Sequence, residues 1–469
     1  TGNRTQDAVV SRIFISAAHK SSGKTLVSMG LCAAYRRRGM RVAAFKKGPD
    51  YIDPAWLAKA SGRACWNLDF FTMDKEEILA CFERHRQDAD VTVVEGNKGL
   101  FDGLDVEGSD SNAALAVALD LPVLLVVDVS GITRGIAPLL TGYTGFDPEV
   151  RIAGVILNRV AGPRQESKLR AAIERYTDLP VLGAIGRDSK LVIEERHLGL
   201  VPGNEDPGAS ARIEEVAKVI EAAVDLDAVL ALTKGQQNTT AVPAFAAPKR
   251  PTGKSRPVRI GIARDRAFGF YYPDDLKAFE NAAAELIPFD TLNDQRLPQV
   301  DGLFIGGGFP ECFLEELSAN VDLRDDIRTF IEDGGPAYAE CGGLMYLSRS
   351  IAWQGSEAPM VGVIPADTLV RSRPVGRGYM QFKALPGHPW PRLLQQPEML
   401  YHAHEFHYSR LENVDSAVQT VLEVRRGYGI DGRRDGIHVA NLLATYAHQR
   451  HVRSNPWVND FVDFVRSCR

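Results

Sequence analysis

Residues 16–25, SAAHKSSGKT, have the residue types and spacing of a loop that binds phosphate groups. They end in Gly23-Lys24-Thr25, the last part of the pattern GxxxxGK[ST], with Ala18 in place of its first glycine. In such a loop, backbone N–H groups and the lysine bind phosphate oxygens, and the hydroxyl group binds Mg²⁺. The residues expected to bind a nucleotide here are Lys20, Ser21, Ser22, Gly23, Lys24 and Thr25.

Two acidic residues follow other apolar runs and are candidates for holding the metal. Glu95 ends the run VTVVE, and Asp50 lies in a predicted loop at 46–54. Because ligands bind at the carboxyl ends of parallel strands, we expect both carboxylates to lie near the phosphate loop and to bind Mg²⁺ or its water. Asn158 follows a further run and is expected to contact the edge of the nucleotide base. For all three residues, a capping or turn residue is the alternative.

Cys341 has the surroundings of a nucleophile. In YAECGGLMY an apolar run reaches the cysteine, two glycines follow, and a helical pattern begins, as in a nucleophile elbow. We expect an exposed thiol at a helix N-terminus, where the helix dipole favours the thiolate. The backbone N–H groups expected to form an oxyanion hole are those of Gly307, Gly308 and Gly342. A buried structural cysteine is the alternative.

A nucleophilic cysteine needs a histidine as its base. Several histidines are available in the same part of the chain: His388, His402, His404, His407, His438, His448 and His451. We favour His448 because ATYAH places it directly after the last expected strand, beside the predicted elbow.

The elements that position these residues alternate between short apolar runs and longer helical patterns. Runs without polar alternation are typical of parallel strands buried on both faces, and the patterns between them, such as 25–38, are typical of crossover helices. We therefore expect an α/β fold with a doubly wound, mostly parallel sheet over residues 1–231. Its expected strands are 12–16, 41–45, 91–94, 122–127 and 152–157.

The composition changes after this domain. Residues 232–257 are rich in Pro, Thr and Ala, and are expected to form a solvated linker. A second α/β domain is expected over 258–469, with strands at 258–263, 302–305 and 337–339. The length of 469 residues suits two or three domains.

The overall composition limits the classes of partner. A formal net charge of −5 argues against a protein that binds nucleic acid by neutralising its phosphates. The 6 cysteines are scattered without zinc-site spacing, which suits a reducing compartment. The apolar runs have strand length and cannot span a bilayer, and the first residues do not form a signal peptide. We expect a cytoplasmic protein without a membrane partner.

Several long segments of the chain resemble the cobyrinic acid a,c-diamide synthase family. The resemblance covers nearly the whole chain and implies a phosphate-loop amidoligase domain, similar to dethiobiotin synthetase, followed by a class I glutamine amidotransferase-like domain. The segments are FKKGPDYIDP (45–54), EGNKGLFDG (95–103), ILNRV (156–160), ERHLGLVP (195–202), FYYPDDL (270–276), GGGFPE (306–311), ECGGLMYL (340–347) and HEFHYS (404–409).

The resemblance implies a reaction and partners. Cys341 and His448 would release ammonia from glutamine, and ATP with Mg²⁺ would phosphorylate a carboxylate of a tetrapyrrole, which ammonia then converts to an amide. Asp102, in the LFDG segment, would position the substrate, and the family implies a homodimer. The residues implied to manage metal and charge are Lys24, Thr25, Asp50 and Glu95.

Some segments depart from the cobyrinate-type pattern. Residues 96–98 (GNK), 130–135 (SGITRG) and 377–381 (RGYMQ) more closely resemble a branch found beside dissimilatory sulphite reductase, which is associated with amidation of sirohaem or its metal-free precursor. The cations Lys98 and Arg134 would pair with substrate carboxylates. These departures favour the sirohaem branch, with cobyrinic acid as the alternative substrate.

Other classes of protein remain open at this point. Class I amidotransferases place a glutamate two residues after the histidine, where this chain has Arg450, so we expect a Cys/His dyad and retain a non-catalytic domain as an alternative. Lys20 is similar to the extra lysine of ParA/MinD-like ATPase switches, although offset by one position. That class, like a dethiobiotin-type ligase, has no use for the domain containing Cys341.

Overall fold

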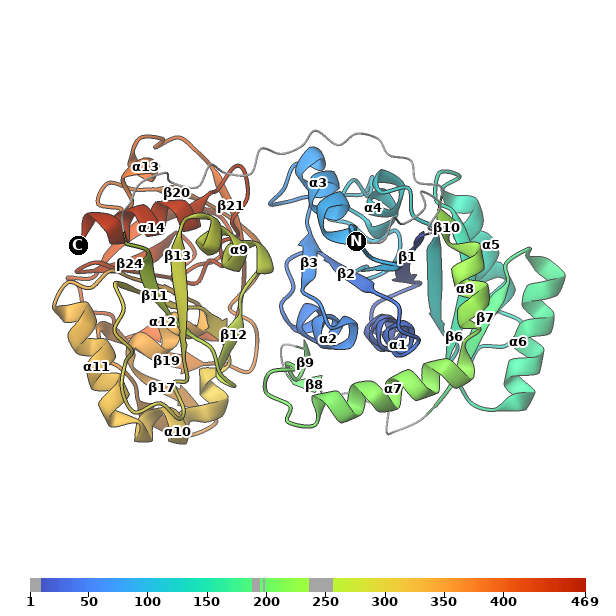
Figure 1. Ribbon diagram of the computed structural model, residues 1–469, viewed down its shortest axis with the longest axis horizontal. Helices are drawn as coiled ribbons and strands as arrows, with labels where there is room; N and C mark the ends of the chain where they lie inside the picture. The colour runs from blue at the N-terminus through green and yellow to red at the C-terminus, as the bar shows by residue number, and fades with distance from the viewer. Residues whose placement is uncertain (1–9, 188–194, 197–198, 236–255) are drawn as a thin grey trace, which may run out of the picture. The chain divides into compact units, whose positions relative to one another are not determined.

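The computed structural model describes residues 10–187, 195–196, 199–235 and 256–469 (Figure 1). The chain divides into two compact units, Thr1–Phe245 and Ala246–Arg469, each considered by itself below. Residues 236–255, most of the predicted linker, lie outside the described residues, as does part of the segment ERHLGLVP. At the start of the predicted linker, Lys234–Gly235 form β10, which pairs with the first strand.

The first unit contains a sheet in the order β3-β2-β4-β1-β5-β6-β7. Neighbours along this path are parallel, and only β10 is antiparallel among the described strands of the sheet. The strand order reverses at β1, which makes its carboxyl end the expected place for a ligand. The strands are β1 (Val10–Ala17), β2 (Val42–Lys47), β3 (Cys65–Leu68), β4 (Val91–Glu95), β5 (Val123–Asp128), β6 (Ile152–Val160) and β7 (Val181–Gly186).

Helices cover both faces of this sheet, so the predicted doubly wound fold is confirmed. Figure 1 shows α1, α2 and α7 on one face and α3 and α4 on the other. Gly30 allows α1 to approach α7, since a Cβ there would lie 2.3 Å from Cγ1 of Ile220. The helices are α1 (Lys24–Arg37), α2 (Ile52–Ser61), α3 (Lys75–Arg86), α4 (Asn112–Ala118), α5 (Ile136–Phe146), α6 (Pro163–Tyr176), α7 (Ala209–Ala223) and α8 (Leu226–Leu232). A small pair, β8 (Glu195–Arg196) and β9 (Gly199–Leu200), precedes α7.

The second unit has a mixed sheet in the order β13-β11-β14-β16-β25-β24-β23-β20-β21. The pairs from β13 to β25 are parallel, and those from β25 to β21 are antiparallel. The predicted strands are β11, β14 and β16, and β25 is the strand expected before His448, whereas the antiparallel pairing beyond β25 was not anticipated. The strands are β11 (Val258–Ala263), β13 (Ala284–Phe289), β14 (Gly302–Ile305), β16 (Ala337–Glu340), β20 (Gly376–Ala384), β21 (Tyr401–His407), β23 (Gln419–Arg426), β24 (Arg434–Val439) and β25 (Leu442–Thr445).

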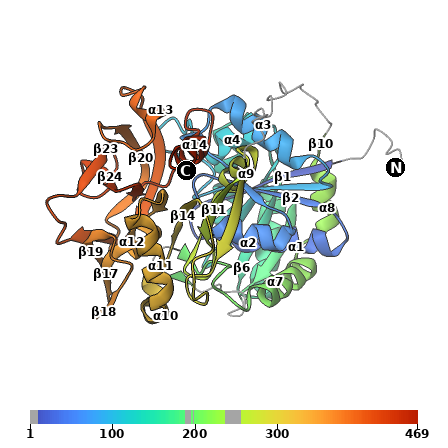
Figure 2. The same cartoon turned by 60° about the vertical axis from the view of Figure 1, so that its left-hand side comes forward.

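Smaller sheets complete the second unit. Figure 2 shows β17, β18 and β19 near α12 and apart from β20, β23 and β24. One small sheet pairs β12 (Phe268–Phe270) with β15 (Gly307–Gly308). The other has the order β18 (Ser356–Pro359), β17 (Ser348–Trp353), β19 (Ile364–Val370) and β22 (Ser409–Glu412). The helices are α9 (Pro273–Asn281), α10 (Leu314–Ala319), α11 (Val321–Glu332), α12 (Gly342–Leu347), α13 (Pro391–Leu394) and α14 (Trp457–Ser467).

The core of the second unit is aromatic. Phe304 and Tyr338 are stacked with ring centroids 5.6 Å apart, and Trp457 lies 4.9 Å from Tyr338. This packing holds β14 and β16 against α14, and so fixes the strand that leads to Cys341. In neither unit does the described part of the chain contain a helix long and apolar enough to cross a bilayer.

Candidate active sites

The predicted phosphate loop connects β1 to α1. Ser21 (φ 63°) and Gly23 (φ 94°) adopt left-handed backbone conformations that turn the chain into the helix. Nδ2 of Asn158 donates to the carbonyl of Ser22 at 2.8 Å, and a Cβ at Gly23 would lie 2.1 Å from that nitrogen. Glycine is therefore required at this position. The amide of Asn158, predicted to contact the base, holds the loop in this structure.

Lys24 opens α1 and points across the loop. Its Nζ donates to the backbone carbonyl of Lys98 at 2.5 Å. Burial, with a further contribution from Lys46, lowers the pKa of Lys24 to about 8. A phosphate group beside Nζ would restore the charged form, since an anion favours a protonated amine.

The predicted acids Asp50 and Glu95 meet at one buried lysine. Nζ of Lys46 lies 2.6 Å from Oε1 of Glu95, 2.5 Å from Oδ2 of Asp53 and 3.8 Å from Oδ2 of Asp50. The hydroxyl of Thr25 donates to the same oxygen of Glu95 at 3.0 Å. The predicted loop at 46–54 was too long, because Lys46 lies within β2, which ends at Lys47, and Asp53 lies within α2, which begins at Ile52. Neither residue was singled out from the sequence.

The electrostatics of this cluster suit a hard cation. Burial raises the pKa of Glu95, and burial with the neighbouring Asp53 raises that of Asp50 to about 7. Oε2 of Glu95 is a buried oxygen with no hydrogen-bond partner in the described part of the chain. The same part contains no ready-made cage of three His, Cys, Asp or Glu side chains. Mg²⁺ usually takes one or two carboxylates plus phosphate oxygens, so these residues fit that metal.

The predicted substrate residues lie in exposed loops. Oδ2 of Asp102 accepts the backbone N–H of Gly99 at 2.8 Å and so shapes the loop that carries Lys98. The side chain of Lys98 is exposed, and its backbone is left-handed (φ 36°). The guanidinium of Arg134 lies over the ring of Tyr176 at 5.4 Å and donates to its hydroxyl. The roles of all three predicted residues in substrate binding stay predictions.

Cys341 forms a sharp elbow between β16 and α12. Its backbone (φ 47°, ψ −99°) is strained for a residue with a side chain, a feature common at active sites. The expectation of an exposed thiol was wrong, because Cys341 is only 7% exposed. Burial, and the charge of Glu311, raise the pKa of the thiol. A hydrogen bond from the backbone N–H of Gly342 acts in the opposite direction, but burial outweighs it, so the thiol needs a base.

His448 and the predicted oxyanion glycines gather beside this elbow. β25 pairs in parallel with β16, and the backbone N–H of Cys341 donates to Thr445 at 2.7 Å, three residues before His448. A Cβ at Gly307 would lie 2.6 Å from Cε1 of His448, and one at Gly342 would lie 2.8 Å from the backbone nitrogen of Gly308. Only glycines permit this approach.

Two further residues lie beside His448: His404, one of the other histidines considered as the base, and Glu340, which the sequence had not indicated. His404, from the HEFHYS segment, exchanges backbone hydrogen bonds with His448, and their rings lie 5.2 Å apart. Oε2 of Glu340 lies 3.6 Å from Nδ1 of His448. The proximity of Glu340 to the nucleophile in sequence was the available signal.

Arg450 has a structural partner elsewhere. Its Nε and Nη2 donate to Oδ2 of Asp274 at 3.1 and 2.6 Å, and its guanidinium lies over the ring of Tyr272 at 5.3 Å. Arg450 therefore binds the start of α9. Because it stands where class I amidotransferases have a glutamate, that position provides no carboxylate for His448.

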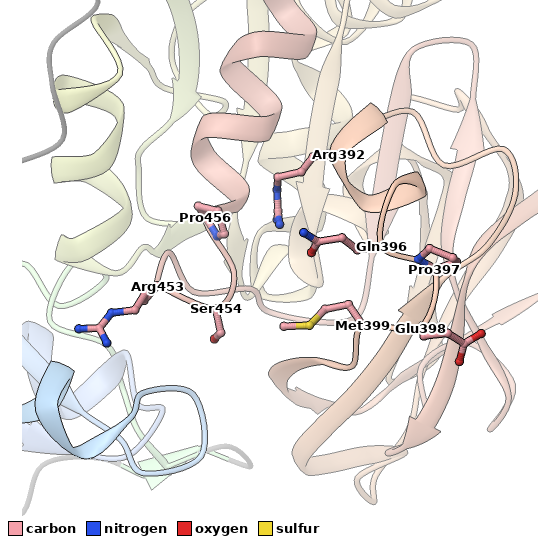
Figure 3. Close-up of a pocket in the computed structure, with 8 residues that line it drawn as sticks. All are labelled: Arg392, Gln396, Pro397, Glu398, Met399, Arg453, Ser454 and Pro456. Atoms are coloured by element: carbon pink, nitrogen blue, oxygen red, sulfur yellow. The ribbon is translucent and has the colours of Figure 1, made fainter.

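A separate hollow of about 680 Å³ lies in the second unit (Figure 3). Its Arg392 is paired with Asp460 at 2.6 Å. None of the predicted site residues lines this hollow, so it is not the candidate active site. The lining residues are Arg392, Gln396, Pro397, Glu398, Met399, Arg453, Ser454 and Pro456.

Comparisons with known proteins match a different domain to each of the two units. Residues 13–201 match the CobQ/CobB/MinD/ParA nucleotide binding domain, and residues 259–456 match the CobB/CobQ-like glutamine amidotransferase domain. A solved glutamine amidotransferase aligns with 44% of this chain and 98% of its own at 14% identity, with a TM-score of 0.31, which is too low to support an inference.

Relatives cover the full length of the chain. A protein of Magnetococcus marinus is 49% identical over 97% of each chain. One of Methanosarcina acetivorans is 38% identical over 99% of this chain and 97% of its own, and one of Listeria innocua is 39% identical over 95% and 97%. All three are named cobyrinate a,c-diamide synthase. The chain belongs to the cobyrinate a,c-diamide synthase family, as its motifs predicted, and joins that family's nucleotide-binding and glutamine amidotransferase domains.

Proposed function

We propose that this chain is an ATP- and glutamine-dependent ligase that converts peripheral carboxylates of a tetrapyrrole into carboxamides. The observation that supports this best is the presence of two different sites on one chain. One brings Lys24, Thr25 and Glu95 to a phosphate loop. The other places Cys341 at an elbow whose backbone N–H binds Thr445, three residues before His448. The names of the relatives support the same class of reaction.

The second unit would supply ammonia. His448 would take the thiol proton of Cys341, and the sulphur would attack the side-chain amide carbon of glutamine. Backbone N–H groups among Gly307, Gly308 and Gly342 would stabilise the oxyanion. His448 then gives its proton to the departing amide nitrogen, so that the tetrahedral intermediate loses ammonia and becomes a thioester. Water then releases glutamate and restores the thiol.

The first unit would activate the acid. A substrate carboxylate oxygen attacks the γ-phosphorus of ATP, giving an acyl phosphate and ADP; ammonia then attacks the acyl carbon and phosphate leaves. Activation is needed because a carboxylate is a poor acyl donor. Lys24 would bind the β- and γ-phosphates, and Thr25 with Glu95 would hold Mg²⁺, which neutralises charge on the transferred group. Asp53, beside Lys46, joins the predicted Asp50 as a candidate for this task.

Two rings are candidates for the substrate. The names of the relatives favour cobyrinic acid. The segments that carry Lys98 and Arg134 depart from the cobyrinate-type pattern, and on that ground we propose sirohydrochlorin or sirohaem as the finer assignment. Both rings carry several carboxylates, so exposed cations suit either.

The deciding experiment incubates the purified protein with ATP, Mg²⁺ and glutamine, and offers sirohydrochlorin, sirohaem and cobyrinic acid separately. Mass spectrometry counts the acid-to-amide conversions. Conversion of the siro compounds alone would support the finer assignment, and conversion of cobyrinic acid alone would overturn it. Hydrolysis of ATP without any amide or glutamate would instead favour a ParA/MinD-like ATPase switch.

Two further expectations belong to this proposal. We propose a homodimer, to be tested by light scattering of the purified protein. We also propose a cytoplasmic enzyme, in accord with cysteines that are all free in the described residues. Fractionation of cells that produce the protein tests the second point.

A further inference from the structure

We propose that Glu340, the residue directly before the nucleophile, is the positioning residue that orients His448 and stabilises its protonated ring. The inference rests on the proposed glutaminase reaction and deepens it. The sequence predicted a Cys/His dyad, and Glu340 extends it to a triad. The acid of this triad comes from β16 and not from the position two residues after His448, which Arg450 occupies.

The two carboxylate oxygens of Glu340 have different environments. Oε1 accepts the hydroxyl of Tyr338 at 2.7 Å and the backbone N–H of Gln449 at 2.9 Å. Oε2 faces Nδ1 of His448 at 3.6 Å. Glu340 is 2% exposed, and His448 is 3% exposed. Oε1 of Glu340 is thus held by two hydrogen bonds. Oε2 is directed toward the buried ring of His448.

The surrounding acids are placed for other tasks. Asp435 accepts the backbone N–H groups of Tyr446 and Ala447 at 3.0 and 2.9 Å. Asp274 binds Arg450. Glu311 lies where its charge acts on the thiol of Cys341. The contacts of Asp435 and Asp274 are thus with other groups, whereas Oε2 of Glu340 lies beside Nδ1 of His448.

The geometry specifies what Glu340 does chemically. A carboxylate at Nδ1 favours the tautomer with its proton on Nδ1, in which Nε2 is unprotonated and can accept the proton of Cys341. When the ring becomes charged, the carboxylate stabilises it. The 3.6 Å separation exceeds a hydrogen bond, but such contacts commonly tighten when substrate binds. Because burial disfavours the thiolate of Cys341, a stabilised imidazolium is needed beside it.

The test is the substitution E340Q in the full-length protein. Glutamine keeps an oxygen for Tyr338 and Gln449 but presents an N–H group to Nδ1, which favours the wrong tautomer. We expect kcat for glutamine hydrolysis to fall by about 10²- to 10⁴-fold, as for other base-orienting acids. The KM for glutamine should change by less than about threefold, because no glutamine contact is removed. The apparent pKa of Cys341, read from the pH dependence of its alkylation by iodoacetamide, should rise.

Controls separate this role from a structural one. D274N makes the same carboxylate-to-amide change at the partner of Arg450, and should leave kcat per folded molecule within about threefold of the wild type. If E340Q lowers the melting temperature strongly, Y338F provides a second test. It removes one anchor of Glu340, and we expect kcat to fall by about 3- to 10-fold with an unchanged KM.

The outcomes are distinct. A wild-type protein that hydrolyses no glutamine would contradict the proposed function itself. A wild type that does so, with E340Q or Y338F retaining its full kcat and an unshifted alkylation profile, would overturn the role of Glu340 alone.

Discussion

Nζ of Lys46 lies 2.6 Å from Oε1 of Glu95, the same oxygen that accepts the hydroxyl of Thr25. The lysine is 3% exposed, and the carboxylates of Asp53 and Glu95 outweigh its burial and raise its pKa. A buried acid without a cation is strongly unfavourable. Lys46 therefore neutralises the acids that are candidates for binding Mg²⁺, and keeps them in place before a nucleotide arrives.

Replacing Lys46 with methionine should destabilise the first unit. The change leaves Asp53 and Glu95 buried without their cation, and breaking one side of a buried pair costs about 3–5 kcal/mol. Urea unfolding of the full-length protein measures this. R38M is the matched control, because the pair of Arg38 with Asp227 is largely exposed and is worth about 1 kcal/mol or less. Equal stability of K46M and R38M would show that the acids are protonated without Lys46.

Alanine at Cys341 should separate the two half-reactions. Loss of the thiol removes the nucleophile, so glutamine-driven amide formation should fall below detection. Amide formation driven by added ammonium should stay within about twofold of the wild type, because the phosphate loop is unchanged. Both rates come from the mass-spectrometric assay. Loss of both would refute the division of labour between the two units.

Strands buried on both faces made much of the fold predictable. β4 (VTVVE) and β5 (VLLVVD) are apolar almost throughout, and their positions agree with the predicted runs. β20 (GRGYMQFKA) and β23 (QTVLEVRR) were missed because they carry polar and charged residues on partly exposed faces. Such strands become identifiable only from the neighbours that cover one face.

The candidate sites divide in the same way. Lys24 and Cys341 lie within motifs whose spacing itself specifies the turn, so the sequence was sufficient for their positions. The roles of Lys46, Asp53 and Glu340 depend on side chains from other elements of the fold. No local sequence pattern predicts which of these side chains lie together. The burial of Cys341 also depends on packing between segments distant in sequence.

Binding of ATP should be accompanied by proton uptake near pH 8. The pKa of Lys24 is lowered to about 8, so roughly half of the molecules are uncharged at that pH, and a bound phosphate raises the pKa again. Uptake should vanish well below pH 7, where Lys24 is already protonated. At pH 8 Asp50, with a pKa of about 7, is mostly ionised and contributes little. Calorimetry in two buffers of different ionisation enthalpy measures the protons.

The variant K24R is the control for this measurement, because arginine stays charged at pH 8. We expect it to bind ATP without proton uptake. The same uptake in K24R and the wild type would assign the proton to another group.

Replacing Lys98 with glutamine should weaken binding of the tetrapyrrole without affecting ATP. Only the exposed side chain changes, and the backbone carbonyl that accepts Nζ of Lys24 remains. Loss of one exposed charge pair is worth on the order of 1 kcal/mol, so kcat/KM for the ring should fall by about 5- to 10-fold. The difference should shrink at high salt, because exposed charges are screened. K168Q removes an exposed lysine from α6 and controls for net charge. If K98Q and K168Q have the same activity on every ring, Lys98 does not contact the substrate. If K98Q loses more activity on sirohydrochlorin than on cobyrinic acid, Lys98 distinguishes between the rings.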